Sequence, residues 1–203
     1  MPQYLFGVLL IVLTMTAIVA VLLGFSVYVL GAEESLALTW GWKIYSPIEE
    51  GFTIKHPQSF TVNPHYMYEG LGRNSRIKGT SFSVSPSLTD GTNLSPQSML
   101  SVERMPHVIE CTADKFLYRP SAKKILEEEG VTYSFAAERE VNDGAAREER
   151  VYALAGSNPC TAIRYTIRAS LIRTDDIVAV REFDQTRLMD TFDAMRRTFT
   201  SRH

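Results

Sequence analysis

The stretch Thr161-Ala-Ile-Arg-Tyr-Thr-Ile-Arg-Ala-Ser170 carries the clearest strand pattern in this chain of 203 residues. Apolar and polar side chains alternate along it, with Ile163, Tyr165 and Ile167 in one set and Arg164, Thr166 and Arg168 in the other. Successive side chains of a strand point to opposite faces of a sheet. The stretch therefore predicts a strand with an apolar face turned to a core and an arginine-bearing face turned outward.

Other short alternating runs lie along the chain. We expect further strands at 51–57, 76–84, 131–137 and 147–154. Polar clusters that contain Gly, such as Glu127–Gly130 and Asn142–Gly144, are typical of the turns between strands.

Three further segments have less regular patterns. Phe60 and Val62 continue the alternation of 51–57, so we expect a hairpin there, while Gly79 is predicted to mark a bulge or a close crossing. Residues 99–105 fit a strand or a short helix, and 113–118 fit a helical turn.

The last element is predicted to be a helix. Asp184 is a suitable N-cap, and apolar side chains then recur at helical spacing, at Leu188, Phe192, Met195 and Phe199. Many strands followed by one amphipathic helix indicate the α+β class, with a central antiparallel sheet flanked by helices.

An apolar segment opens the chain. Met1 to Ala32 contains no charged residue or His, and Tyr4 to Leu30 is long enough to cross a bilayer core of about 30 Å as a helix. A cleaved signal peptide would have a basic start and a much shorter apolar core. We therefore expect a single transmembrane anchor over 1–32, whose partner is the lipid bilayer, followed by a linker at 33–47 and a globular domain at 48–203.

Trp40, Trp42 and Tyr45 lie in this linker. Their rings fit either an aromatic belt at the membrane interface or packing on the domain, and the pattern does not separate the two.

Cys111 and Cys160 are the only cysteines. An even pair behind an export-competent anchor favours a disulfide, and hence a domain outside the cytoplasm, whereas two buried thiols would suit a cytoplasmic domain. Positive charges near the span are too few to decide the orientation. The cysteine pair therefore carries the prediction of a single-pass cell-membrane protein with its C-terminal domain outside the cytoplasm.

Charge and motifs limit the classes of function. The 21 Lys and Arg nearly balance the 23 Asp and Glu, which argues against a nucleic-acid partner. Phosphate-binding, dinucleotide-binding, zinc-binding and serine-hydrolase motifs are absent from the sequence, so we assign no catalytic residue and no cofactor.

Two candidate sites remain. His56, His65 and Glu69 would approach one another in the expected hairpin and could hold a metal or act in acid–base chemistry, although histidines beside prolines are more often found in surface turns. On the outer face of the strand 161–170, Arg164 and Arg168, with Arg173 beyond, could contact an anionic ligand.

Several motifs resemble a known family. Gly51-Phe-Thr-Ile-Lys-His-Pro57 is similar to the Gly-Phe-x-Ile-x-x-Pro strand that opens members of the PsbP/Mog1-like family, and the helix carrying Phe192 to Phe199 is similar to the one that closes them. This family shares the fold of the photosystem II extrinsic protein PsbP and the nuclear-import factor Mog1. Over about residues 50 to 200, the resemblance implies an α/β/α sandwich and transfers no active site.

A second resemblance is to a group of uncharacterised bacterial proteins from candidate-phylum lineages. It rests on five motifs: Asn93-Leu-Ser95, Leu100-Ser-Val-Glu103, Cys111-Thr-Ala-Asp114, Val151-Tyr-Ala153 and Asn158-Pro-Cys-Thr-Ala162. Those proteins are mostly exported or anchored and carry a similar cysteine pair.

Together these features predict a membrane-tethered, non-enzymatic domain that binds an unknown protein or envelope partner as an accessory or assembly module. The alternative is a ligand-binding or metal-binding carrier, or a hydrolase, that uses a cleft near His56, His65 and Glu69.

Overall fold

The computed structural model describes residues 39–72, 75–172 and 180–201. The chain divides into two compact units, Met1–Gly41 and Trp42–His203, and all the described helices and strands belong to the second. The predicted membrane segment Tyr4–Leu30 lies outside the described residues. Within the described ranges, no helix is long and apolar enough to span a membrane.

The described part holds ten strands, two α-helices and one 3-10 helix. The strands are β1 (Lys43–Tyr45), β2 (Phe52–His56), β3 (Thr61–Tyr68), β4 (Ile77–Ser83), β5 (Met99–Met105), β6 (Lys124–Glu128), β7 (Val131–Asn142), β8 (Ala145–Leu154), β9 (Cys160–Ser170) and β10 (Thr200–Ser201). The helices are α2 (Pro86–Thr89), the 3-10 helix η1 (Ala113–Phe116) and α3 (Gln185–Arg197).

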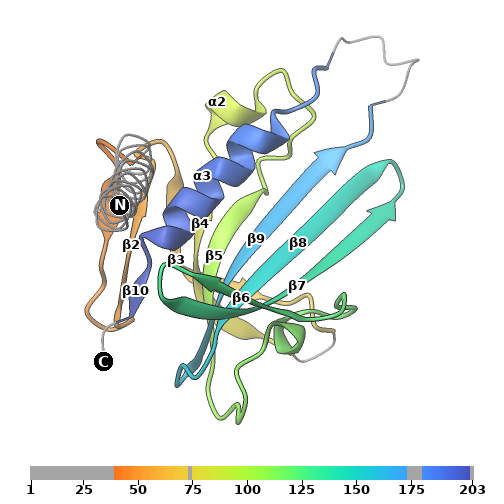
Figure 1. Ribbon diagram of the computed structural model, residues 1–203. Helices are drawn as coiled ribbons and strands as arrows, with labels where there is room; N and C mark the ends of the chain where they lie inside the picture. Colours follow the sequence, from red (N-terminus) through yellow and green to blue (C-terminus); the bar gives the residue numbers. More distant parts are fainter. Residues whose placement is uncertain (1–38, 73–74, 173–179, 202–203) are drawn as a thin grey trace, which may run out of the picture. The chain divides into compact units, whose positions relative to one another are not determined.

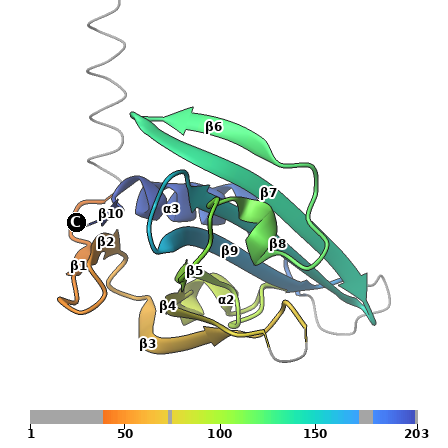
Figure 2. The same ribbon diagram turned by 90° about the horizontal axis from the view of Figure 1, so that it is seen from below.

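Two antiparallel sheets form the second unit. Seven strands pair in the order β3-β4-β5-β9-β8-β7-β6, and a smaller sheet has the order β1-β2-β10. Figure 1 shows α3 lying across the larger sheet, and Figure 2 shows that sheet from another side, with β3 and β6 at its opposite edges. Antiparallel sheets with few helices confirm the α+β class.

The strand at 161–170 is the middle of the larger sheet. As β9 it lies between β5 and β8 and pairs with both over most of its length. The ambiguous segment 99–105 is a strand, β5, because it pairs with β9 on one side and with β4 on the other.

The predicted hairpin of 51–57 with 60–62 is wrong. β2 pairs with β1 and β10 in the smaller sheet, whereas β3 pairs with β4 in the larger one. The reason is a long-range contact: Phe52 of β2 stacks on Phe199, which follows α3, with ring centroids 5.6 Å apart. β1 lies within the stretch 33–47 that we predicted as a linker.

The turn predictions are confirmed at both ends of β7. Glu129 and Gly130 have φ values of 50° and 79°, and Asp143 and Gly144 have values of 47° and 80°. Two consecutive residues with positive φ define the tight hairpin turn whose twist matches that of antiparallel strands. Gly79 has the predicted close crossing, since an added Cβ would lie 2.4 Å from the Val102 carbonyl oxygen.

The two faces of the larger sheet have separate cores. One face packs against α3 through Tyr165 of β9 and Phe192 of the helix, whose rings are 5.2 Å apart. Asp184 caps that helix, accepting a hydrogen bond from the Arg187 amide, so the predicted helix start is confirmed. The other face packs against the segment that contains η1, in a second buried cluster.

Candidate functional site

The arginine-bearing face of β9 is buried, so the prediction that it is an outer face is wrong. Arg164 has an exposed fraction of 0%. Strands β5 and β8 flank it, and its Nη2 donates a 2.6 Å hydrogen bond to the carbonyl oxygen of Phe116, in the η1 segment that covers this face. Alternation shows which side chains share a face of a strand, but it does not show whether another segment covers that face.

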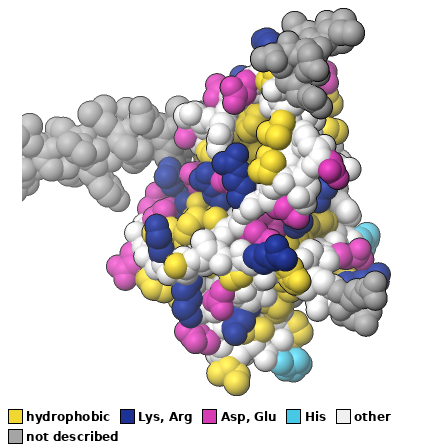
Figure 3. Space-filling view, turned by 90° about the vertical axis from the view of Figure 1, so that its right-hand side faces the viewer, with side chains coloured by type: hydrophobic (Ala, Val, Ile, Leu, Met, Phe, Trp, Pro, Cys, Tyr) yellow, Lys and Arg dark blue, Asp and Glu magenta, His cyan; other side chains and the backbone are white. Residues whose placement is uncertain are grey.

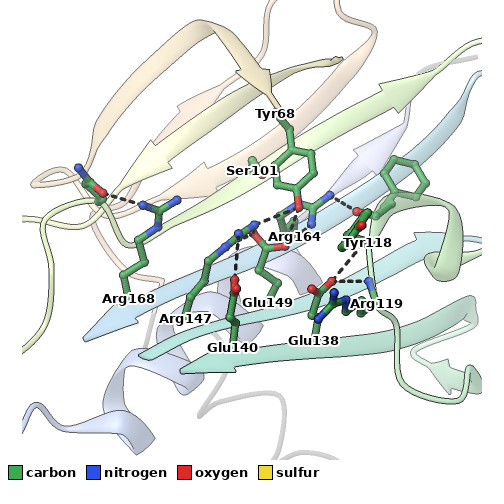
Figure 4. A network of polar contacts seen from close by, with 12 residues as sticks. Tyr68, Ser101, Tyr118, Arg119, Glu138, Glu140, Arg147, Glu149, Arg164 and Arg168 are labelled. Carbon is green, nitrogen blue, oxygen red and sulfur yellow. Dashed lines mark hydrogen bonds and ion pairs between the residues drawn. The ribbon is translucent and has the colours of Figure 1, made fainter. Parts of the chain in front are cut away.

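Arg164 is the centre of a buried ion cluster. Its Nε and Nη2 donate to the two carboxylate oxygens of Glu103, each at 2.8 Å, and its Nη1 donates to Glu149 at 2.9 Å. The guanidinium carbon lies 3.5 Å from the centre of the Tyr68 ring. Figure 4 shows Arg164 beside Tyr68 and Glu149. The contact with Glu103 is two-pronged, and such arginine–carboxylate pairs are among the strong ion pairs in proteins.

Tyr68 and Arg147 extend this cluster toward the surface. The Tyr68 hydroxyl donates to Glu149 at 2.7 Å, and Arg147 Nη2 donates to both the Tyr68 oxygen (3.1 Å) and Glu149 (2.6 Å). Arg147 and Glu149 lie two positions apart on one face of β8, and Glu149 is only 2% exposed.

The buried ion cluster has balanced charges, and its carboxylate oxygens all have hydrogen-bond donors. Two arginines balance two glutamates, and all four carboxylate oxygens accept hydrogen bonds, with Ser101 also donating to Glu103. Burial alone would lower the pKa of Arg164, but the charges of Glu103 and Glu149 raise it above its ordinary value. Burial raises the pKa of Tyr68 as well. Arg164 therefore stays charged and Tyr68 stays neutral at neutral pH, and the cluster holds the strands together.

The predicted anion site does not assemble on Arg164. Its guanidinium is occupied by two carboxylates and a carbonyl, as described above. Arg168 Nη1 donates to Gln97 at 2.8 Å, apart from the buried ion cluster in Figure 4, and its Nε is buried without a hydrogen-bond partner. Arg173 lies outside the described residues.

A second buried arginine lies on the opposite face of the sheet, at the end of α3. Arg196 Nε donates to the Tyr165 hydroxyl and Nη2 donates to Glu128, each at 2.8 Å. Its guanidinium carbon is 4.3 Å from the centre of the Tyr152 ring. Burial raises the pKa of Tyr165 well above its ordinary value. Arg196 thus joins α3 to β6 and β9.

His56, His65 and Glu69 do not form one site. The His56 ring is buried against Phe82, with centroids 5.3 Å apart, and its Nδ1 is 2.9 Å from the carbonyl oxygen of Pro57. Glu69 forms an exposed ion pair with Arg76 at 2.9 Å, and His65 is exposed on β3. Among the described residues, no group of three or more His, Cys, Asp or Glu is arranged to hold a metal ion.

A pocket of about 350 Å³ opens on the α3 side of the larger sheet, beside the start of that helix. Small residues form its hollow, because Ala146 of β8 pairs directly with Ala169 of β9. Ile167 and Phe183 give it apolar walls, and the lining also includes charged residues, Arg139, Glu148 and Glu182. We call this hollow the α3 pocket.

The wall of the α3 pocket is held rigidly. Asn93 Nδ2 donates to the Ser170 carbonyl at 2.8 Å, while its Oδ1 accepts from the Phe183 amide at 2.9 Å. One side chain thus fastens the segment before α3 to the end of β9. Figure 3 shows one side of the molecule, where basic and acidic side chains are interspersed with hydrophobic ones.

The cysteines form a disulfide, with Cα atoms 5.1 Å apart. It joins the segment before η1 to the first residue of β9, inside the second buried cluster. A second hollow of about 350 Å³ lies beside Cys111 and is bordered by His107, Ile109 and Ser157.

Comparisons with known proteins identify no family for this chain. No family model matches it, and no curated protein matches it either. A solved structure from Bacteroides thetaiotaomicron VPI-5482 is similar over 79% of this chain, with 9% sequence identity and a TM-score of 0.43. This chain spans 48% of the length of that protein.

Sequence reasoning missed the partners of Arg164 and the residues of the α3 pocket. Glu103 and Glu149 each stand in a strand-like run next to apolar residues, Leu100-Ser-Val-Glu103 and Glu149-Arg-Val-Tyr152, which is a weak sign of burial. The pair Ala146 and Ala169 carries no such sign, because pairing across strands depends on a register that the sequence does not display.

Proposed function

We propose that this protein is a membrane-tethered binding module whose ligand site is the α3 pocket. The observation that carries the proposal is the rigid hollow beside α3, where Ala146 and Ala169 make space between apolar walls and a rim with charges of both signs. Ligand sites are usually preformed, largely apolar hollows with a few polar groups that orient the ligand. An amphipathic ligand with a small apolar group and a charged end fits this lining.

Binding suits the described residues better than catalysis does. The carboxylates in the buried ion cluster are at most 2% exposed and are paired with arginines, so a substrate does not reach them. His56 is buried away from the α3 pocket lining, and Glu69 is paired with Arg76. These contacts therefore favour the accessory or assembly role expected from the sequence over a carrier or hydrolase that uses a cleft near His56.

The same proposal places the domain outside the cytoplasm of a cell whose membrane holds Tyr4–Leu30 as a single span. Two features support it. The uncharged apolar run is long enough for a bilayer, and disulfides such as Cys111–Cys160 persist in oxidising compartments.

We also propose a PsbP/Mog1-like relationship for the fold. An antiparallel sheet with a closing helix on one face, as β9 and α3 provide, supports it, together with the Gly51-Phe-Thr-Ile motif that leads into β2. Among the described residues the opposite face carries only the short η1 and its flanking chain, so the second helical layer of an α/β/α sandwich is reduced here.

The test of the pocket is a filling substitution with a neighbour as control. Ala146→Phe should fill the α3 pocket, whereas Ala145→Phe places the same ring on the exposed neighbouring position of β8, which points to the opposite face. Each full-length variant is purified from detergent-solubilised membranes, and its bound molecules are identified by native mass spectrometry and by cross-linking. A species retained by wild type and Ala145→Phe but lost from Ala146→Phe supports the site. Equal retention by Ala146→Phe contradicts it.

The tether and its orientation are tested separately. The chain should stay with the lipid fraction after alkaline washing. In intact cells an impermeant thiol reagent should label Cys111 and Cys160 only after an added reductant opens the disulfide. Labelling that requires permeabilised membranes would show that the domain faces the cytoplasm.

A further inference from the structure

The edge of the smaller sheet exposes large apolar side chains where the chain leaves the predicted membrane span. Ile44, on edge strand β1, is 63% exposed, and Ile48, in the turn that follows, is 90% exposed. Figure 2 shows β1 at the margin of the domain. Isolated exposed isoleucines are common on protein surfaces, so their surroundings decide whether they have a role.

The inner face of this edge is already occupied. Tyr45 contacts Phe82 edge-to-face with ring centroids 5.5 Å apart, and Trp42 packs against the same core. Of the two aromatic roles that the sequence left open, packing on the domain therefore applies to these two residues. Ile44 points the other way, because its strand partner is Lys55 on the outer face, while Tyr45 pairs with buried Ile54.

The charges on the Ile44 face are compatible with a lipid surface. Lys55, the strand partner of Ile44, is partly exposed and can reach headgroup phosphates while its alkyl stem stays near apolar groups, whereas Lys43 lies on the face of Tyr45. Glu50 is turned inward, since its carboxylate accepts hydrogen bonds from Thr80 (2.6 Å) and Tyr45 (3.3 Å). Exposed Glu49 is then the acidic neighbour, and Lys55 balances its charge.

The length of the connecting chain allows this edge to reach lipid. Leu30 ends the apolar run, and twelve residues, 31–42, separate it from Lys43, so the connection spans at most about 45 Å. A unit the size of Trp42–His203 has a radius of gyration of about 15 Å. The tether thus holds the domain within about one domain diameter of the bilayer, with β1 as its first element.

We propose that Ile44 and Ile48, with Lys55, form a lipid-contact surface that lies on the bilayer holding Tyr4–Leu30. This inference rests on the proposed membrane tether and adds an orientation for the domain. The two isoleucines insert at the boundary between headgroups and acyl chains, as the apolar faces of interfacial anchors do. With β1 on the membrane, the α3 pocket keeps a constant orientation relative to the lipid surface.

The experiment measures the surroundings of single positions in the full chain. Ile44→Cys and Ile48→Cys are spin-labelled with the native disulfide intact, in protein reconstituted into phosphatidylcholine vesicles. Ile125→Cys is the matched control, because Ile125 is 62% exposed on β6, at the far edge of the other sheet. Collisional relaxation by oxygen, which concentrates in lipid, is compared with relaxation by a water-soluble nickel chelate.

The expected result is an oxygen-to-nickel ratio severalfold higher at positions 44 and 48 than at position 125. Equal ratios at the three positions, in a chain that resists alkaline washing of the same vesicles, overturn the lipid contact and leave the tether intact. Release of the chain by that washing overturns both. Spin–spin broadening at position 48 that disappears on dilution with unlabelled chain assigns the surface to a second copy, which also overturns the proposal.

Discussion

Removing the Arg164 guanidinium tests the role we assign to the buried ion cluster. Arg164→Met keeps an unbranched side chain of similar length but has no charge and no donors. The substitution removes both hydrogen bonds to Glu103, the one to Glu149 and the one to the Phe116 carbonyl. Glu149 keeps Tyr68 and Arg147 as donors, and Glu103 keeps only Ser101. The variant therefore leaves a buried glutamate without its cation.

The magnitude follows from burial. Because Arg164 and Glu103 are both 0% exposed, water does not replace the lost contacts. Breaking a buried ion pair by removing one partner costs about 3–5 kcal/mol of unfolding free energy. The exposed pair Arg76–Glu69, whose side chains are 67% and 62% exposed, provides the control, and Arg76→Met should cost less than about 1 kcal/mol.

The assay is urea-induced unfolding of the oxidised full chain in detergent, followed by near-ultraviolet circular dichroism. A lower midpoint at an unchanged slope reports lost stability and not a changed denatured state. Adding Glu103→Gln to Arg164→Met should restore about 1–3 kcal/mol, since the unpaired charge is then gone. Equal midpoints for Arg164→Met and Arg76→Met, or no restoration in the double variant, would refute the reasoning.

Three further predictions concern stability. Replacing both Cys111 and Cys160 by Ala should lower the unfolding free energy by about 4 kcal/mol, because the disulfide closes a loop of 49 positions, and the same urea titration measures it. Burial lowers the pKa of His56 below 6.5, so its contribution to stability is complete above that pH and is lost as the pH falls through the lowered value. The stability of wild type relative to His56→Gln should fall on acidification, whereas a His65→Gln control should follow wild type; parallel curves for all three would contradict this. Gly79→Ala should cost about 1–3 kcal/mol in thermal unfolding, because its Cβ would lie 2.4 Å from a backbone oxygen of β5.

Local chemistry made several elements predictable. The alternation at 161–170 identifies β9, and Asp143-Gly144 identifies the turn between β7 and β8 through its preference for positive φ. Asp184 and the helical spacing of Leu188 and Phe192 identify α3. Each of these signals depends on residues close together in the chain, so no long-range contact is needed to interpret it.

The candidate site was much less predictable. The α3 pocket depends on the register that places Ala146 opposite Ala169, and on Asn93, which fastens a segment ninety positions further along the chain at Phe183. None of these pairings has a local signal. The proposed site at His56 failed for the same reason, since the smaller sheet separates β2 from β3.

The sequence by itself determined which side chains share a face, where the turns occur, which helix closes the domain and that an uncharged apolar segment precedes it. Only the tertiary structure decided what covers each face. Arg164 belongs to a polar set by its position in β9, yet the η1 segment and the carboxylates of β5 and β8 enclose it. Periodicity is a property of one strand, whereas burial depends on segments that fold against it from elsewhere in the chain.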